Sequence, residues 1–269
     1  MKIIKSINKL HKEVNFKANI GFVPTMGALH KGHISLIESS KKKCQKTVVS
    51  IFVNPSQFNK KNDYKNYPRN ISKDLKILKK LNVEYVFLPK KNDIFKNSNS
   101  MKIKINKKDK ILCAKFRKGH FEGVLGVIHQ FLKIIKARYM FLGEKDFQQV
   151  YIIKKYINKK FKTKIISKKT IRNNVLFAYS SRNNLLSKKD LNTGSLIAQI
   201  INQYYHKIKK KFKSINKLNE IKKKIISLGV KIEYFEVRNK YNLSKNINKA
   251  NFKIFISYYI NNIRLIDNF

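Results

Sequence analysis

Two histidines that frame a glycine, in the run His30-Lys31-Gly32-His33, are the strongest candidates for chemistry in this sequence. They follow the apolar run Ile20–Val23 through a short turn, and a turn that opens a helix attracts phosphate through free N–H groups and the helix dipole. Gly27 and Gly32 let the backbone approach a ligand closely. The histidines, three residues apart, share one helical face. We therefore expect a phosphate-bearing ligand here. Zinc is disfavoured, because neither a cysteine nor a third histidine lies at ligand spacing.

Polar residues also follow a second apolar run, at 47–53. Asn54 and Gln57 carry amides that both donate and accept hydrogen bonds, which suits a small polar substrate. The pair Asn54-Pro55 is also an ordinary turn initiator. By itself, this segment supports a binding role and a simple turn about equally.

A third apolar run ends in Gly143-Glu144-Lys145-Asp146. Lys145 could neutralise a phosphate, and Asp146 could orient it or hold a metal. The acidic residues are also favourable at a helix N-terminus without any further role, but we favour a functional one. Further along, Tyr179-Ser180-Ser181-Arg182-Asn183 places two hydroxyls beside a guanidinium, as a phosphate clamp would. That composition is common in loops, so the signal is weak.

The elements that must position these residues alternate through the first two-thirds of the chain. Short apolar runs, rich in β-branched and aromatic residues, predict buried strands at 20–23, 47–53, 83–88 and 138–142. Between them, helical spacing places Ile71, Leu75 and Leu78 on one face, and does the same for Val124, Ile128, Phe131 and Ile135. This alternation predicts a doubly wound parallel sheet, in which ligands bind at the carboxyl ends of the strands.

The pattern changes after about residue 181. Residues 187–228 are expected to be helical, and 230–237 and 252–260 to be strands. We therefore predict two domains, an α/β domain at 1–177 and a smaller α+β domain at 178–269. The stretch 97–100 is expected to be a loop tip.

Composition limits the function classes. The chain has 269 residues and 42% hydrophobic residues, so we expect a globular protein with real cores. The charge is extreme, with 61 Lys and Arg against 15 Asp and Glu. Because the lysines are spread along the chain, compositional drift is favoured over specific nucleic-acid binding. Two isolated cysteines, no signal segment and no apolar stretch of about 18 residues indicate a soluble cytoplasmic protein without a membrane partner.

Taken together and in this order, the segments resemble the pantothenate synthetase (pantoate–β-alanine ligase) family. The motifs that carry the resemblance run through nearly the whole chain and are weakest between 190 and 250. They are Val-Pro-Thr-Met-Gly-x-Leu-His-x-Gly-His at 23–33, Ile-Phe-Val-Asn-Pro-x-Gln-Phe at 51–58, Tyr-Pro-Arg at 67–69, Gly-His-Phe-x-Gly-Val at 119–124, Gly-Glu-Lys-Asp-Phe-Gln-Gln at 143–149, Ser-Ser-Arg-Asn at 180–183 and Arg-Leu-Ile-Asp-Asn at 264–268.

The resemblance implies a Rossmann-like nucleotidyltransferase domain of the His-x-Gly-His superfamily, followed by a small α+β lid domain, in a homodimer. It also implies a two-step reaction that uses Mg²⁺. ATP and pantoate first give pantoyl adenylate and pyrophosphate. The amine of β-alanine then attacks the acyl carbon, which gives pantothenate and AMP.

Site residues are carried over from the same resemblance. Catalytic roles are implied for His33 (the proton donor), His30, Lys145 and Arg182. The implied ATP site consists of Met26, Gly27, His30, His33, Gly143, Glu144, Lys145, Asp146, Ile171, Tyr179, Ser180, Ser181 and Arg182. Pantoate is expected at Gln57, Gln149 and Asn54, and β-alanine at Gln57.

The chain departs from the family pattern in three places. Lys118 stands where Arg-Pro-Gly-His usually has proline, which loosens a wall loop. The usual Asp-Gly-Leu-Ala before Ser-Ser-Arg-Asn is Val175-Leu176-Phe177-Ala178, which loses a turn glycine and an acidic residue. An acidic pair near the metal in some members is Lys73-Asp74 here, so Asp74 is left as the candidate metal ligand.

Two other function classes compete with this interpretation. The His-x-Gly-His motif alone also allows an adenylyltransferase for another acid or nucleotide, although Asn54, Gln57 and Gln149 match the pantoate pattern. The net charge of +46 allows a nucleic-acid-binding protein. Such a protein would show a dense basic face and steep salt dependence, yet no localised basic-aromatic motif is present.

Overall fold

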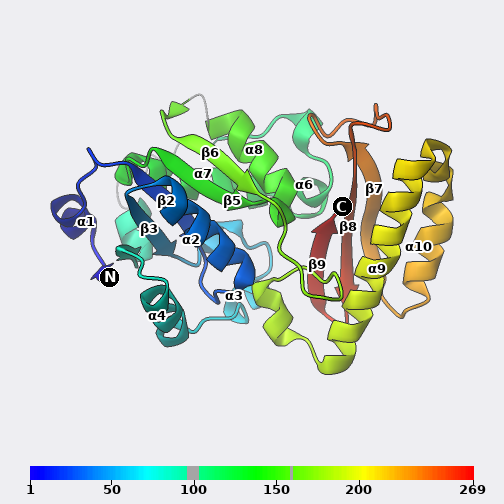
Figure 1. The fold of residues 1–269 in the computed structure, drawn as a ribbon, viewed down its shortest axis with the longest axis horizontal. Helices are drawn as coiled ribbons and strands as arrows, with labels where there is room; N and C mark the ends of the chain where they lie inside the picture. The colour runs from blue at the N-terminus through cyan, green and yellow to red at the C-terminus, as the bar shows by residue number, and fades with distance from the viewer. Residues whose placement is uncertain (96–102, 158–159) are drawn as a thin grey trace. The chain divides into compact units, whose positions relative to one another are not determined.

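The computed structural model describes residues 1–95, 103–157 and 160–269, which form two compact units, Met1–Lys169 and Thr170–Phe269. Each unit has its own sheet and its own buried apolar cluster (Figure 1). The domain boundary expected after residue 177 lies eight residues beyond this division, and Phe177 is buried in the cluster of the second unit. The loop tip expected at 97–100 lies outside the described residues.

The first unit is built on a six-stranded sheet in which every pairing is parallel. In spatial order the strands are β1 (Lys2–Ile4), β4 (Tyr85–Phe87), β3 (Lys46–Ile51), β2 (Ile20–Thr25), β5 (Tyr139–Gly143) and β6 (Lys164–Lys168). The chain runs from β2 outward to β3 and β4, then returns to place β5 on the other side of β2. The strand order therefore reverses between β2 and β5, where sheets of this type bind ligands at the carboxyl ends.

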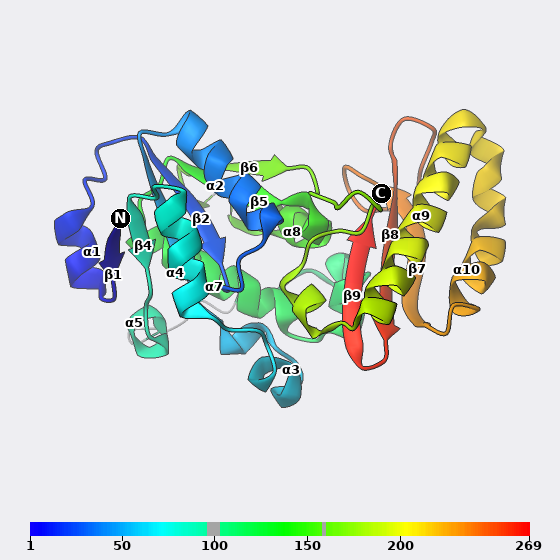
Figure 2. The ribbon, with the colours of Figure 1, turned by 60° about the horizontal axis from the view of Figure 1, so that its bottom comes forward.

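Helices cover both faces of this sheet, which is why its strands are apolar almost throughout. On one face, Val23 and Val49 pack with Ile37 of α2 and Leu78 of α4, two helices in front of the strands in Figure 2. On the other face, Phe131 of α7 contacts Phe22 and Phe87 edge-on. The helices of the unit are α1 (Ile7–Glu13), α2 (Lys31–Lys43), α3 (Lys61–Lys65), α4 (Ile71–Lys80), α5 (Lys91–Phe95), α6 (Cys113–Phe116), α7 (His120–Ile134) and α8 (Phe147–Ile157).

The predicted doubly wound parallel sheet is confirmed, and its four predicted strands correspond to β2, β3, β4 and β5. The two edge strands, β1 and β6, were not predicted. β1 has three residues, and β6 begins and ends with exposed lysines around partly buried residues. Edge positions of this kind need no continuous apolar run, so they leave a weak sequence signal.

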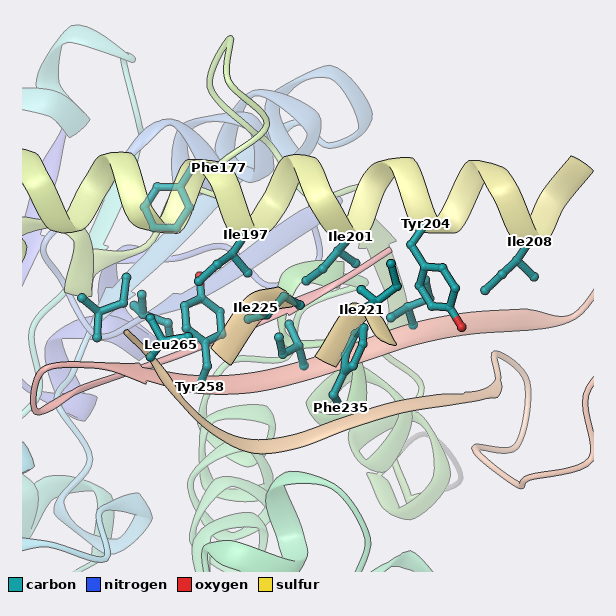
Figure 3. Close-up of a cluster of buried hydrophobic side chains, with 14 of the residues drawn as sticks. Phe177, Ile197, Ile201, Tyr204, Ile208, Ile221, Ile225, Phe235, Tyr258 and Leu265 are labelled. Atoms are coloured by element: carbon teal, nitrogen blue, oxygen red, sulfur yellow. The ribbon is translucent and has the colours of Figure 1, made fainter. Parts of the chain in front are cut away.

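The second unit packs two helices on a three-stranded antiparallel sheet, in the order β7-β8-β9. Ile197, Ile201, Tyr204 and Ile208 line one face of α9, above strand residues such as Phe235 and Tyr258 (Figure 3). The elements are α9 (Lys188–Lys210), α10 (Leu218–Ile226), β7 (Lys231–Asn239), β8 (Phe252–Ile260) and β9 (Ile263–Asn268), with short 3₁₀ turns at Ser181–Leu185 and Phe212–Lys217. The expected smaller α+β domain is therefore confirmed, with β9 as an unpredicted third strand. Within the described ranges, no helix has the length and apolarity that a membrane crossing needs.

The segment that departs from the family pattern at 175–178 still forms a tight turn. Arg172 and Ala178 form an antiparallel bridge, and Oδ1 of Asn173 accepts hydrogen bonds from the N–H groups of Val175 and Phe177. Leu176, in the place of the usual glycine, adopts a left-handed conformation with φ of 67°. In residues other than glycine, that conformation costs roughly 1–2 kcal/mol of stability. The turn is therefore kept at a local cost in stability.

This strain gives a prediction for paired substitutions. Leu176→Gly and Leu176→Ala both remove the side chain, but only glycine relieves the strained backbone, so the glycine variant should be more stable by about 1 kcal/mol. At the neighbouring Val175, which lacks a positive φ, the order should reverse, because glycine costs about 0.5–1 kcal/mol of chain entropy there. Urea unfolding of the glycine and alanine variants at both positions measures the two differences in stability. If glycine and alanine rank in the same order at 175 and at 176, a left-handed Leu176 is refuted.

Candidate active site

Helix α2 is capped by the side chains of two histidines. Nδ1 of His30, the N-cap residue, accepts a hydrogen bond from the backbone N–H of Gly32 at 3.1 Å. In return, Nδ1 of His33 accepts one from the backbone N–H of His30 at 3.4 Å. This is the geometry of a capping box, with histidine in both of the places that Ser or Thr and Glu usually occupy. The two ring centroids lie 4.0 Å apart.

The capping bonds determine where each ring carries its proton. A backbone N–H can only donate, so both Nδ1 atoms are unprotonated and the proton of each neutral ring is on Nε2. Burial lowers the pKa of His30 to about 2, and the His33 ring and Lys145 act in the same direction. Burial also lowers the pKa of His33 to about 4, where Asp146 opposes the shift and Lys145 reinforces it. Both rings are therefore neutral at pH 7, and each has one Nε2–H donor for an anion.

Gly32 is required by the His30 ring. A Cβ at Gly32 would lie 2.9 Å from Cε1 and 3.0 Å from Nδ1 of His30, closer than side-chain atoms normally approach. Any larger residue would push the ring out of its capping position. We expected Gly32 to admit a ligand, but the close contact that the structure shows at this position is with the ring.

A buried carboxylate holds the loop that leads into α2. Oδ2 of Asp74 accepts a hydrogen bond from the N–H of Ala28 at 2.9 Å, and Oδ1 accepts one from Leu29 at 2.8 Å. Gly27 and Ala28 both have positive φ angles, of 79° and 48°, and backbone in this region persists only where its surroundings hold it. Burial raises the pKa of Asp74, and the two backbone N–H groups oppose that shift. Asp74 thus holds the backbone directly before His30 in place.

The same contacts bear on the metal role expected for Asp74. Its side chain is 1% exposed, and each of its oxygens already accepts a backbone N–H. Mg²⁺ binds through one or two carboxylates together with several waters and substrate phosphates. Among the described residues, no three His, Cys, Asp or Glu side chains gather closely enough to hold a metal ion.

The residues that follow β3 contact the loop that follows β2. Asn54 caps a short 3₁₀ turn, Pro55–Gln57, and its Nδ2 donates to Oε1 of Gln57 at 3.4 Å and to the carbonyl of Gly123 at 3.1 Å. Nε2 of Gln57 contacts Sδ of Met26, which precedes the histidine turn. Both amides are buried, with 1% exposure for Asn54 and 9% for Gln57. The structure thus brings the predicted pantoate residues Asn54 and Gln57 beside a predicted ATP residue.

Strand β5 brings a cation to the histidine pair. It ends at Gly143, and Lys145 forms an ion pair with Asp146 at 3.7 Å. The charge of Lys145 acts on both histidine rings, and that of Asp146 acts on His33, which places this turn against the start of α2. Glu144 accepts a hydrogen bond from Ser167 of β6 at 2.9 Å. Gln149 follows on α8 with a partly exposed side chain.

The remaining predicted ATP residues lie in the second unit and form a cluster of their own. The N–H of Tyr179 donates to the carbonyl of Ile171 at 3.1 Å. Oγ of Ser180 accepts from the N–H of Arg182 at 3.3 Å, so it caps the 3₁₀ turn that carries Arg182. Ser181 is buried within the same turn. That these residues bind the same ATP molecule as the histidine pair stays a prediction.

Two residues near the site received no role from the sequence. Arg117 and His120 lie beside and within the motif at 119–124, and both contact the carbonyl oxygen of Gln57. The available signal was the spacing of His120 and Gly123, which places them on one face at the start of α7.

Comparison with known proteins identifies the family. The model of the family described as pantoate-beta-alanine ligase matches residues 2–269. The chain belongs to the pantoate-beta-alanine ligase family. A pantothenate synthetase from Francisella tularensis subsp. novicida is 40% identical over 268 residues, which cover 99% of this chain and 95% of the relative. The family expected from the motifs is therefore confirmed.

Solved structures of this family agree with the fold. The crystal structure of the pantoate-beta-alanine ligase from Francisella tularensis, complexed with beta-gamma ATP and beta-alanine, is 38% identical with a TM-score of 0.87. The match covers 100% of this chain and 97% of the solved chain. The pantothenate synthetase from Thermus thermophilus is 23% identical with a TM-score of 0.91, covering 100% and 99%, and supports the fold alone.

The contact between Gly32 and the His30 ring can be tested with Gly32→Ala. Alanine is the better helix former by about 1 kcal/mol, yet its Cβ should displace the His30 ring and remove a cap that contributes about 1 kcal/mol. The two effects on stability nearly cancel, so we expect a melting temperature within a few degrees of the parent. Turnover should fall at least about tenfold, because the ring no longer holds its Nε2–H in place.

The matched control is Gly126→Ala in α7, where an added Cβ meets nothing within 4 Å. This variant should keep parental turnover and gain stability. Parental turnover in Gly32→Ala would contradict the role assigned to the capping contact.

Proposed function

We propose that this protein catalyses the ATP-dependent ligation of pantoate and β-alanine to pantothenate through a pantoyl adenylate. The observation that carries the proposal is the pair of neutral histidines at the start of α2, with Lys145 beside them. Two N–H donors and one cation form a site for phosphate oxygens at the strand ends where the sheet order reverses. Family membership supports the choice of pantoate and β-alanine as substrates.

In the first step, a carboxylate oxygen of pantoate attacks the α-phosphorus of ATP. A new phosphorus–oxygen bond forms, the bond from the α-phosphorus to the bridging oxygen breaks, and pyrophosphate leaves with the electron pair. Negative charge spreads over phosphate oxygens, so the protein acts mainly by positioning and electrostatics. In our proposal Nε2–H of His30, Nε2–H of His33 and the ammonium of Lys145 stabilise that charge, and the resemblance gives Arg182 the same role.

We propose a modified form of the role that the resemblance gives to His33. Because its pKa is lowered to about 4, His33 is neutral at pH 7. A neutral imidazole that gave up its remaining proton would become an imidazolate, which is unfavourable at this pH. In our proposal His33 therefore donates a hydrogen bond from Nε2 and keeps its proton.

In the second step, the uncharged amine of β-alanine attacks the acyl carbon of pantoyl adenylate. A carbon–nitrogen bond forms, the carbon–oxygen bond to AMP breaks, AMP leaves with the electron pair, and the nitrogen releases a proton to solvent. The leaving group is already activated, so no covalent enzyme intermediate is needed. We propose Gln57, Gln149 and Asn54 as the pantoate residues, with Gln57 also serving β-alanine.

The ATP residues in this proposal are carried over from the resemblance: Met26, Gly27, His30, His33, Gly143, Glu144, Lys145, Asp146, Ile171, Tyr179, Ser180, Ser181 and Arg182. Mg²⁺ is expected with ATP, and Asp74 stays the candidate ligand that the resemblance implies; each of its oxygens accepts one backbone N–H and keeps a further lone pair. No step of the proposal runs through the metal. We further propose, on the resemblance, a cytoplasmic homodimer.

The function is tested with purified protein, ATP, pantoate and β-alanine. We expect AMP release that requires both pantoate and β-alanine, and pantothenate as the product. Folded protein without turnover on pantoate, or one that prefers another acid in a substrate panel, would overturn the proposal.

The role of His33 is tested with two substitutions that each keep one of its functions. His33→Asn keeps an acceptor near the position of Nδ1 for the cap but loses the Nε2–H donor. His33→Gln can return an N–H near the position of Nε2 but loses the acceptor. We expect the rate of adenylate formation to fall at least about tenfold in His33→Asn and to be less impaired in His33→Gln. The reverse order would show that the cap alone explains the requirement for His33.

A further inference from the structure

Arg117, which follows α6, and His120, the first residue of α7, converge on the 3₁₀ turn that carries Gln57. Nδ1 of His120 lies 2.7 Å from the carbonyl oxygen of Gln57, and Nη2 of Arg117 donates to the same oxygen at 3.1 Å. Nη1 of Arg117 lies 3.0 Å from Nε2 of His120. Arg117 and His120 therefore each direct a donor at one backbone oxygen, and Arg117 also donates to His120.

The triangle allows one protonation state of His120. A carbonyl oxygen only accepts, so Nδ1 of His120 carries the proton. A guanidinium only donates, so Nε2 of His120 is unprotonated. His120 is therefore neutral, with its proton on the opposite nitrogen from His30 and His33. It is 7% exposed, so water does not replace these partners.

Backbone contact reinforces the side-chain bonds. A Cβ at Gly123 would lie 2.3 Å from the carbonyl oxygen of Ser56 and 3.0 Å from the N atom of Gln57, so only glycine lets α7 approach this turn so closely. The carbonyl of Gly123 accepts the bond from Asn54. Lys118 stands where the family has proline, and its carbonyl oxygen accepts a hydrogen bond from Nδ2 of Asn59. The departure at Lys118 thus leaves this clamp of Arg117, His120 and Gly123 complete.

We propose that Arg117, His120 and Gly123 are positioning residues for Gln57, and that they set the affinity of the site for the carboxylic-acid substrate. The inference rests on the proposed function, in which Gln57 binds pantoate. All three act through the backbone of the Gln57 turn, and a displacement of about 1 Å in a substrate-holding group is enough to weaken binding and catalysis severely. The ATP phosphates bind elsewhere in the proposal, at the start of α2, so their affinity should be insensitive to the clamp.

The test compares His120→Ala with His120→Asn. Alanine removes the donor to the Gln57 carbonyl, and the asparagine Nδ2–H can restore a donor near the position of Nδ1. In His120→Ala we expect KM for pantoate to rise at least about tenfold, with KM for ATP changing less than about twofold. His120→Asn should recover most of the pantoate affinity. An equal rise in both KM values, no rise in KM for pantoate, or no recovery with asparagine would overturn the inference.

His129→Ala is the matched control. His129 lies nine residues after His120 on the same helix, about 13 Å along its axis; it is 5% exposed and contacts Phe161 edge-on. Its substitution should cost comparable stability and leave both KM values near the parental ones. A rise in KM for pantoate in this variant would show that damage to α7 alone produces the effect.

A spectroscopic measurement on the unsubstituted protein covers the case in which the variants fold poorly. Nitrogen-15 NMR of the histidine rings should show His120 protonated at Nδ1 and unprotonated at Nε2 at pH 7. A proton on Nε2 would overturn the clamp whatever the kinetics. If the parental protein is inactive on pantoate, the proposed function fails; if it is active and the His120 variants are unaffected, only this inference fails.

Discussion

The first turn of helix α2 has backbone N–H groups that no helical carbonyl can satisfy, and two histidine rings satisfy two of them. That reciprocal cap makes both Nδ1 atoms acceptors, which leaves Nε2–H on each ring for an anion. Burial and the nearby charge of Lys145 keep the rings neutral. One local constraint thus explains why histidine occupies both positions and why a residue without a side chain stands at Gly32 between them.

The rest of the first unit serves to hold this turn. Strand β2 is central and pairs with β3 and β5, so the polar residues that follow these three strands meet at one edge of the sheet. Asp74 reaches from α4 to fix the loop before His30, and Lys145 comes from the end of β5. On the other side, α7 fixes the Gln57 turn through its first residues. The buried valines and phenylalanines between the helices supply the rigidity that such a site requires.

Much of this arrangement could be predicted from the sequence, because the histidines and Lys145 follow apolar runs that can only be buried strands. The capping contacts could not, since they depend on ring orientation and on the space that Gly32 leaves. Leu176 gives no local signal for a left-handed turn, because the surrounding hairpin bonds impose it. Likewise, His120 and Asp74 act through backbone groups of other segments, and only the folded chain brings those groups to them.

The protonation of His30 and His33 can be measured directly by nitrogen-15 NMR of the imidazole rings between pH 5 and pH 8. We predict that both rings stay neutral across this range, with Nδ1 unprotonated and the proton on Nε2, because their pKa values lie below it. Titration of either ring near the ordinary pKa of about 6.5, or a proton on either Nδ1, would contradict it.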